Sequence, residues 1–231
     1  MPENGLKTFA VHSSDEWVGT QMIYGQRMVN GALRSYALAS DVVAHEITHG
    51  LTDRTARLEY QRETGALNES YSDILVVIIA NRHRSSFDDW NWEVGEDLDL
   101  TGVPIRDLSD PPRRGQPAHM RDFRTLDPDA DLTNENDWGW VHVNSGIHNK
   151  AAFNLMASRN AAGGRLFTPR EAAALFYVAL TQYLSRTSGF SDSRRGVELA
   201  ARTLFRDDEP ATKARKLATV ATAFNDVGIT A

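Results

Sequence analysis

Residues 44 to 50 of this chain read AHEITHG, and three of these side chains could do metal chemistry. On an α-helix, His45 and His49 lie one turn apart on the same face, so both imidazole rings can reach one ion. Glu46 lies beside them, where its carboxylate could take a proton from a water molecule at the site. The spacing suits zinc, but the same pattern also occurs by chance in helices, so the segment alone leaves both interpretations open.

A zinc site needs a third protein ligand, and with no cysteine in the chain it must be a His, Asp or Glu. The segment NESYSD offers Glu69, with Asp73 one turn further along the same face of a second helix. Asp73 could accept the free ring N–H of a ligand histidine and fix its tautomer. A solvated or capping carboxylate explains Asp73 better in isolation, whereas beside the HExxH pattern the metal interpretation is favoured.

The composition is that of a folded globular protein. The 231 residues fit one large domain or two small ones, and 41% of them are hydrophobic. A formal net charge of −6, with no Lys/Arg-rich run, argues against nucleic acid and anionic membranes as partners. The longest apolar run, residues 74–80, is too short to span a membrane, and the start does not read as a signal peptide. We expect a cytoplasmic protein or a mature secreted form whose leader has been removed.

The pattern along the chain changes near residue 40. Before it, VGTQMIYG followed by the segment from Gly25 to Gly31 predicts a hairpin. From Ser40 a helical period appears in SDVVAHEITHGLT and again in GALNESYSDILVVIIANRHR. An acidic, proline-rich loop region follows from about Ser85 to Asp137, and helices resume at Gly146.

The remainder of the chain is predicted to be helical. Thr168 as N-cap, Pro169 at the first helical position and Glu171 as capping-box partner mark one helix start. Two more amphipathic helices are expected at 191–205 and 210–227. The predicted fold class is α+β, with a short β-rich rim over residues 1–39 and a helical catalytic domain over 40–231, together forming one compact unit.

Three blocks of the sequence, HEITHG, GALNESYSD and DWGWVHVNSGIHNKAAF, resemble the thermolysin-type neutral zinc metalloproteases in order and spacing. The likeness extends from EWVGTQMIYG at Glu16 to the C-terminus, although much of the family's β-rich N-terminal half has no counterpart. It implies a zinc metalloendopeptidase of the gluzincin type, acting on peptide or protein substrates. A propeptide or a proteinaceous inhibitor is a further partner that the resemblance implies.

The resemblance also implies roles for individual residues. The implied zinc ligands are His45, His49 and Glu69. Glu46 would be the general base, and His142 with Tyr60 would donate hydrogen bonds to the developing oxyanion. The implied supporting pairs are Asp73 for His45, Asn68 for His49 and Asp137 for His142. Arg106 would bind a substrate carbonyl while bracing the zinc glutamate.

The chemistry of these residue types is consistent with amide hydrolysis. Three protein ligands leave a fourth position for water, whose pKa zinc lowers to about 7. Glu46 could then take a proton and deliver it to the leaving amine. For specificity, the resemblance places Val42, Ile105 and the segment from Leu33 to Tyr36 at the pocket for the residue after the cleaved bond. Val42, Ile105, Leu33 and Tyr36 are apolar or aromatic, which predicts an apolar residue there.

Calcium is the second metal that the resemblance implies. The candidate ligands are Asp41, Glu93, Glu96 and Asp97, whose hard oxygen donors suit Ca²⁺. Ala80 and Asn91 stand where the family has acidic ligands of a two-ion site, so at most one ion is expected. The alternative is a solvated acidic loop.

Two further departures from the family concern Asp15 and His148. An Asn-Ala pair that binds substrate backbone in the family falls at Ser14 and Asp15. A carboxylate at that rim predicts a preference for Lys, Arg or a peptide N-terminus near the cleavage site, unless Asp15 points to solvent or caps a turn. His148 stands where the family has an apolar residue, and we interpret it as a local surface change.

Two alternatives to a general endopeptidase remain. The shortened N-terminal region could form a differently shaped cleft, as in a processing peptidase that trims one partner. The chain could also be an inactive, zinc-stabilised binding module. The presence of Glu46, His142 and Tyr60 argues against the module, because a structural zinc site needs neither a base nor oxyanion donors.

Overall fold

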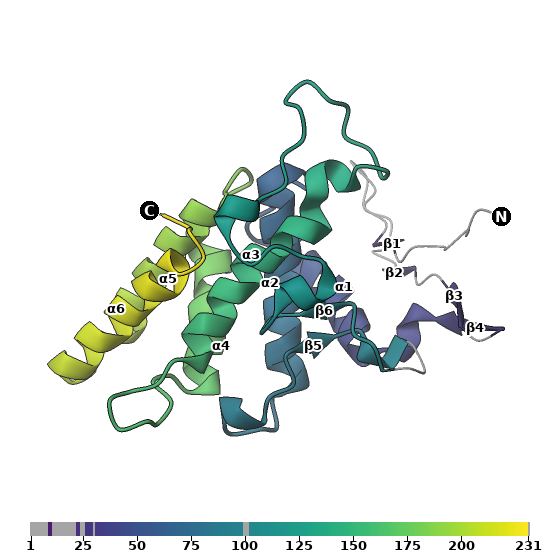
Figure 1. Cartoon of the computed structure of the whole chain (residues 1–231). Coiled ribbons are helices and arrows are strands. Elements are labelled where there is room, and N and C mark those ends of the chain that lie inside the picture. The colour runs from purple at the N-terminus through teal and green to yellow at the C-terminus, as the bar shows by residue number, and fades with distance from the viewer. Residues whose placement is uncertain (1–8, 11–21, 24–25, 30, 99–101, 231) are drawn as a thin grey trace.

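The structure is a computed structural model that describes residues 9–10, 22–23, 26–29, 31–98 and 102–230 (Figure 1). Helices form most of the described part. The α-helices are α1 Ser40–Arg54, α2 Arg62–Ala80, α3 Asp137–Ala157, α4 Pro169–Val178, α5 Phe190–Leu204 and α6 Pro210–Asn225. In the described part, no helix is both long and apolar enough to cross a membrane.

The strands are short and pair only in antiparallel fashion within the described residues. The pairs are β1 Phe9–Ala10 with β2 Met22–Ile23, β3 Gln26–Val29 with β4 Ala32–Ser35, and β5 Glu93–Val94 with β6 Arg106–Asp107. The hairpin of β3 and β4 turns at Gly31, whose φ of +79° suits glycine. The α+β fold class is confirmed, and the division into residues 1–39 and 40–231 stays a prediction.

Helix α2 lies at the centre of the molecule, between α1 and α3 (Figure 1). Its residues from Gly65 to Val77 are all buried, which contributes about 1.5–3 kcal/mol for each large aliphatic side chain. Gly65 allows a close approach to α3, because a Cβ there would lie 2.5 Å from Val141 Cγ1. The polar residues on this buried helix therefore need partners inside the protein.

Helix α3 begins at Asp137, well before the start expected at Gly146, so that expectation is wrong. Its first turn is left-handed, with φ of 50°, 89° and 67° at Trp138, Gly139 and Trp140. The Asp137 carboxylate accepts a hydrogen bond from the backbone N–H of His142 at 2.9 Å. This N–H lies where the right-handed part of α3 begins and would otherwise have no partner within the helix. The left-handed conformation destabilises each non-glycine residue by about 1–2 kcal/mol. A sequence pattern therefore does not predict a helix at Trp138 and Trp140.

The helix starts predicted after α3 agree closely with the structure. Thr168 and Glu171 form the expected capping box at α4, and α5 and α6 lie within two residues of their expected bounds. Between α2 and α3, the described residues form short elements only: η2 Phe87–Asp89, β5, η3 Glu96–Leu98, β6, η4 Pro111–Arg114 and η5 Met120–Asp122. Strand β6 places Arg106 against the side chains of α2.

Candidate active site

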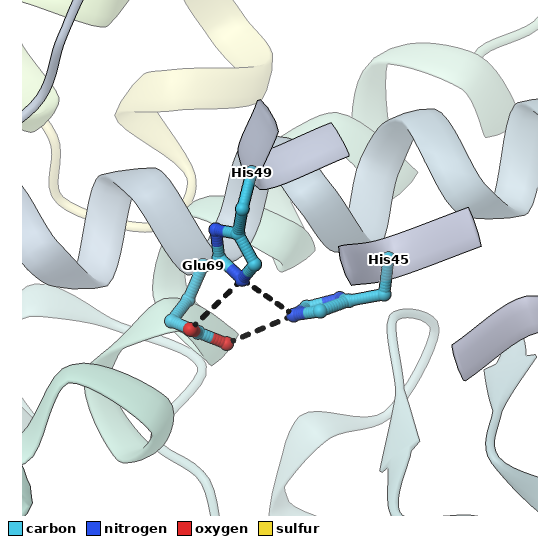
Figure 2. A group of neighbouring side chains, drawn as sticks. All are labelled: His45, His49 and Glu69. Atoms are coloured by element: carbon cyan, nitrogen blue, oxygen red, sulfur yellow. Dashed lines mark hydrogen bonds and ion pairs between the residues drawn. The ribbon is translucent and has the colours of Figure 1, made fainter. Parts of the chain in front are cut away.

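Three donor atoms from α1 and α2 converge on one point (Figure 2). His45 Nε2 lies 3.1 Å from His49 Nε2 and 3.2 Å from Glu69 Oε2. His49 Nε2 lies 3.3 Å from Glu69 Oε1. All three residues are buried, and among the residues that the structure describes they are the one group able to hold a metal ion in this way.

These distances fit a zinc ion. Four donors at 2.0–2.1 Å around a tetrahedral ion lie roughly 3.3 Å apart, which matches the observed separations. Two neutral imidazole nitrogens and a carboxylate that face one another repel unless a proton or a cation lies between them. Two nitrogens and one oxygen form a set of ligands typical of zinc.

The charges around this point are unbalanced. Glu69 and Asp73 are fully buried carboxylates, and Arg106 is the guanidinium between them. Burial alone would raise the pKa of Glu69, but the charges of His142, His49 and His45 hold it well below its usual range. Burial likewise opposes the charged form of His45, yet the charge of Glu69 and the contact with Asp73 raise its pKa to about 9. Two buried carboxylates beside one guanidinium leave a net negative charge, which a cation at this point would offset.

The expected partners of the two histidines are in place. Asp73 Oδ1 lies 3.0 Å from His45 Nδ1, a polar contact that lacks hydrogen-bond geometry. Asn68 Oδ1 lies 2.9 Å from His49 Nδ1, and the Asn68 amide donates to the Leu58 carbonyl, which fixes the amide orientation. His49 Nδ1 must then carry the proton, which leaves Nε2 free for an ion.

Arg106 contacts both buried carboxylates. It donates to Glu69 Oε2 at 3.0 Å and to Asp73 Oδ1 at 2.7 Å. Burial disfavours the charged guanidinium, but the charges of Asp73 and Glu69 raise the pKa of Arg106 above its ordinary value. Arg106 therefore holds the two carboxylates in a fixed relation to each other.

Tyr60 and His142 lie together on one side of Glu69. The Tyr60 hydroxyl donates to Glu69 Oε1 at 2.5 Å and lies 3.1 Å from His142 Nε2. Tyr60 is 39% exposed, yet its hydroxyl is enclosed, and burial together with the Glu69 charge raises its pKa. Asp137 Oδ1 lies 2.5 Å from His142 Nδ1, so this carboxylate holds the ring with Nε2 toward Glu69.

The remaining candidates are placed less completely. Glu46 is half-buried on α1 and makes no hydrogen bond with any residue that the structure describes. Val42 is buried, and Ile105 is 44% exposed and packs its side chain over Gly95. The side chains of Leu33 and Tyr36 are not described, and Ser14 and Asp15 lie outside the described residues.

Three of the four acidic candidates for calcium have other partners in this structure. Asp41 accepts the backbone N–H of Gly95, Glu96 Oε1 accepts from Asn91 Nδ2 at 2.5 Å, and Glu93 pairs with Arg113 at 3.3 Å. Asp97 is exposed. Burial together with the charges of Asp41 and Asp97 raises the pKa of Glu96. Within the described residues these carboxylates do not gather around one point.

The interpretation of His148 as a surface change is wrong, because this residue has no exposed surface. It lies on the face of α3 that packs against α2, with hydrogen-bond partners on α2 and α5. Three further polar residues near the site were not predicted from the sequence: Ser70, Asn149 and Ser72. Ser72 Oγ lies 3.2 Å from His49 Nδ1. Ser70 and Ser72 flank Tyr71 on a helix with a long apolar run, which signals burial.

Comparison with known proteins agrees with the geometry of this site. A family model described as "Thermolysin metallopeptidase, alpha-helical domain" matches residues 56–229, and one described as "Thermolysin metallopeptidase, catalytic domain" matches residues 11–53. A bacillolysin of Bacillus amyloliquefaciens is 36% identical over 220 residues, which cover 94% of this chain and 36% of that protein. An extracellular elastase of Staphylococcus epidermidis is 40% identical over 197 residues, or 83% of this chain and 33% of that protein.

A solved structure is similar as well. It is titled "Precursor of Protealysin, Metalloproteinase from Serratia proteamaculans", with a TM-score of 0.70 and 30% sequence identity over 93% of this chain and 64% of that chain. The chain spans about a third of the length of the bacillolysin and the elastase. The family model that covers residues 56–229, the relatives and the grouping of His45, His49 and Glu69 agree: this chain belongs to the thermolysin metallopeptidase family.

Proposed function

We propose that this chain carries the active site of a zinc-dependent endopeptidase that hydrolyses peptide bonds. The observation that carries the proposal is the convergence of His45, His49 and Glu69 on one point, with Tyr60 and His142 beside it. A structural zinc site would need the three ligands alone. The family and the relatives named bacillolysin, elastase and zinc metalloproteinase support the same conclusion.

His45 Nε2, His49 Nε2 and Glu69 would hold the zinc ion. When bound, zinc supplies Lewis-acid polarisation of the substrate carbonyl and makes a nearby water molecule acidic. Glu46 would accept the proton of the attacking water and pass it to the leaving amine. Its half-buried position on α1, beside the ligand histidines, and its lack of hydrogen-bond partners among the described residues support this role.

Tyr60 and His142 would donate hydrogen bonds to the oxygen of the carbonyl under attack. Their polar atoms lie 3.1 Å apart and face the same oxygen of Glu69, so both are aimed at the neighbourhood of the ligands. Asp137 would keep the His142 ring in this orientation. Arg106 would brace Glu69 and Asp73 from the other side and bind a substrate carbonyl.

Substrate preference and further ligands are part of the proposal. Val42 and Ile105 would favour an apolar residue after the cleaved bond, and Asp15 would favour a cationic group near it. A relative of known structure is titled a precursor, which supports a segment removed before activity in this protein too. We also propose at most one weak calcium site at Asp41, Glu93, Glu96 and Asp97, because three of these carboxylates already have protein partners.

Cleavage of internally quenched peptides blocked at both ends tests the proposal. The zinc-loaded protein should cut them, lose activity with a chelator and regain it with zinc. Leu after the scissile bond should be preferred over Asp by at least about tenfold, since a matched apolar contact is worth about 1–3 kcal/mol. No cleavage by zinc-loaded protein, or cleavage that survives metal removal, would contradict the proposal. Matched Lys and Gln peptides, tested with Asp15→Asn, examine the cationic preference.

A further inference from the structure

A second buried polar cluster lies next to the metal-ligand group, centred on His148 of α3. His148 Nδ1 lies 2.7 Å from Ser70 Oγ on α2, and its Nε2 lies 2.8 Å from Ser193 Oγ on α5. None of these three residues has exposed surface. The surrounding rings are Tyr71, Phe176, Phe190 and Phe224. Protein groups therefore supply both hydrogen bonds of this imidazole.

The cluster continues to the carboxylate beside the first zinc ligand. Ser70 Oγ lies 2.7 Å from Asn149 Oδ1, and Asn149 Nδ2 donates to Asp73 Oδ2 at 2.8 Å. The other oxygen of this carboxylate, Asp73 Oδ1, lies 3.0 Å from His45 Nδ1. At the far end, the Tyr71 hydroxyl lies 2.8 Å from Ser193 Oγ. A continuous path of polar contacts thus joins α5, α3, α2 and α1.

The carboxylate of Asp73 sets the direction of every hydrogen bond in this path. Arg106 donates to Asp73 Oδ1 at 2.7 Å and Asn149 Nδ2 donates to Asp73 Oδ2 at 2.8 Å, so both oxygens of this carboxylate act as acceptors. Asn149 must then turn its NH₂ group to Asp73 and its carbonyl to Ser70. Ser70 must spend its one proton on Asn149, so it can only accept from His148.

The same reasoning determines the tautomer of His148. Its Nδ1 carries the proton and donates to Ser70, which leaves Nε2 to accept from the Ser193 hydroxyl. Ser193 then accepts from Tyr71. Burial lowers the pKa of His148 to about 3, which agrees with a neutral ring that donates on one side and accepts on the other.

We propose that His148 is a positioning residue for the zinc ligand His45, acting through Ser70, Asn149 and Asp73. Its Nδ1–H occupies the acceptor side of Ser70, so the serine proton can point only at Asn149. Asn149 in turn holds the Asp73 carboxylate, whose second oxygen faces His45. Without the His148 donor, Ser70 is free to rotate, and Asp73 loses part of its hold. This inference rests on the proposed zinc site.

Two amide variants separate the two sides of the ring. The amide of His148→Asn reaches about as far as Nδ1 and can still donate to Ser70. The longer side chain of His148→Gln reaches about as far as Nε2 and leaves Ser70 without its donor. His148→Leu removes both contacts, whereas Tyr71→Phe removes only the last hydroxyl of the path and serves as a control for loss of core stability.

The readout is the rate at which zinc leaves the folded full chain in the presence of a chromophoric chelator. Loss of a group that supports a ligand typically weakens metal binding 10–100-fold, and we expect the low end here. His148→Gln and His148→Leu should release zinc roughly tenfold faster, whereas His148→Asn and Tyr71→Phe should stay within about twofold of wild type. The melting temperature should fall in all four variants, because each loses a buried hydrogen bond.

Equal release rates in wild type and in His148→Gln and His148→Leu would overturn the positioning role. Equal acceleration by Tyr71→Phe would overturn it too, because a general loosening of the core would then explain the effect. A wild-type chain that holds no zinc would overturn the proposed function and this role with it. A zinc-binding wild type with unchanged variants would overturn only the role of His148.

Discussion

The group of His45, His49 and Glu69 and the path through His148 are two buried polar clusters that meet where Asp73 contacts His45, but they differ in how their atoms are paired. In the path, each donor meets an acceptor, from Tyr71 to Asp73. In the first group, two ring nitrogens and a carboxylate face one another at 3.1–3.3 Å with no donor fixed between them. Histidine burial alone is therefore no sign of a metal site, whereas acceptors that face acceptors are.

Removal of one ligand from the group of His45, His49 and Glu69 should have the largest effect on zinc content and on peptide hydrolysis. In His49→Ala two ligands remain, so zinc should be lost, and peptide hydrolysis should approach the uncatalysed rate, at least about 10⁶-fold slower. Metal analysis after dialysis, with a peptide assay, measures both losses. Ser72→Ala is the matched control, because Ser72 contacts His49 Nδ1 without being a ligand. Full zinc content in His49→Ala would contradict the assignment.

The donors beside the first group should affect rate without affecting metal content. In His142→Ala both kcat and kcat/KM should fall about 10²–10³-fold, with KM nearly unchanged, because the contact forms in the transition state. Zinc content should stay at the wild-type level. A change confined to KM would make His142 a substrate-binding residue instead.

The path through His148 should make the protein sensitive to acid. The pKa of His148 is about 3 in the fold and 6.5 when exposed, so between these values the unfolded chain binds an extra proton. Its contribution to stability is present above pH 6.5 and falls by about 1.4 kcal/mol per pH unit toward pH 3. Tyr71, whose pKa burial raises, packs against the His148 ring, and the other surrounding rings are Phe176, Phe190 and Phe224, which do not titrate.

Urea unfolding of wild type and His148→Leu over this pH range measures that contribution. The variant should be less stable than wild type at pH 7, because Ser70 and Ser193 lose a partner. The difference between the two proteins should shrink as the pH falls below 6.5. A difference that stays constant with pH would mean that His148 takes up a proton equally well in the folded and unfolded chain.

Addition of calcium should have the smallest effect, a slight rise in the free energy of unfolding. The carboxylates of Asp41, Glu93 and Glu96 resemble the path through His148, since each already contacts a protein group. We expect about 1 mM Ca²⁺ to stabilise the protein by less than about 1 kcal/mol, as for a weak site that must displace these contacts. Thermal unfolding with and without calcium measures this shift. A stabilisation of about 3 kcal/mol or more would mean a preformed, tight site.

Local patterns in the sequence predicted much of the fold and the candidate site. The spacing of His45 and His49 on one helix face and the capping box at Thr168 depend on neighbours in the chain, so the sequence reveals them. The burial of His148 depends on how α3 packs against α2 and α5, and the left-handed turn before His142 depends on tertiary contacts that offset its strain. The pattern of a single sequence contains no information on such tertiary contacts. The predictions of a surface His148 and of a helix that begins at Gly146 are therefore wrong.

The central claim is that the first cluster holds zinc for catalysis, and Glu46→Gln tests it most directly. This substitution removes the proposed base but no ligand, and Gln keeps the size of the side chain. We predict that the purified variant binds as much zinc per chain as wild type and hydrolyses end-blocked peptides at least about 10²-fold more slowly. A variant that keeps a tenth or more of wild-type activity with its zinc in place would contradict the account.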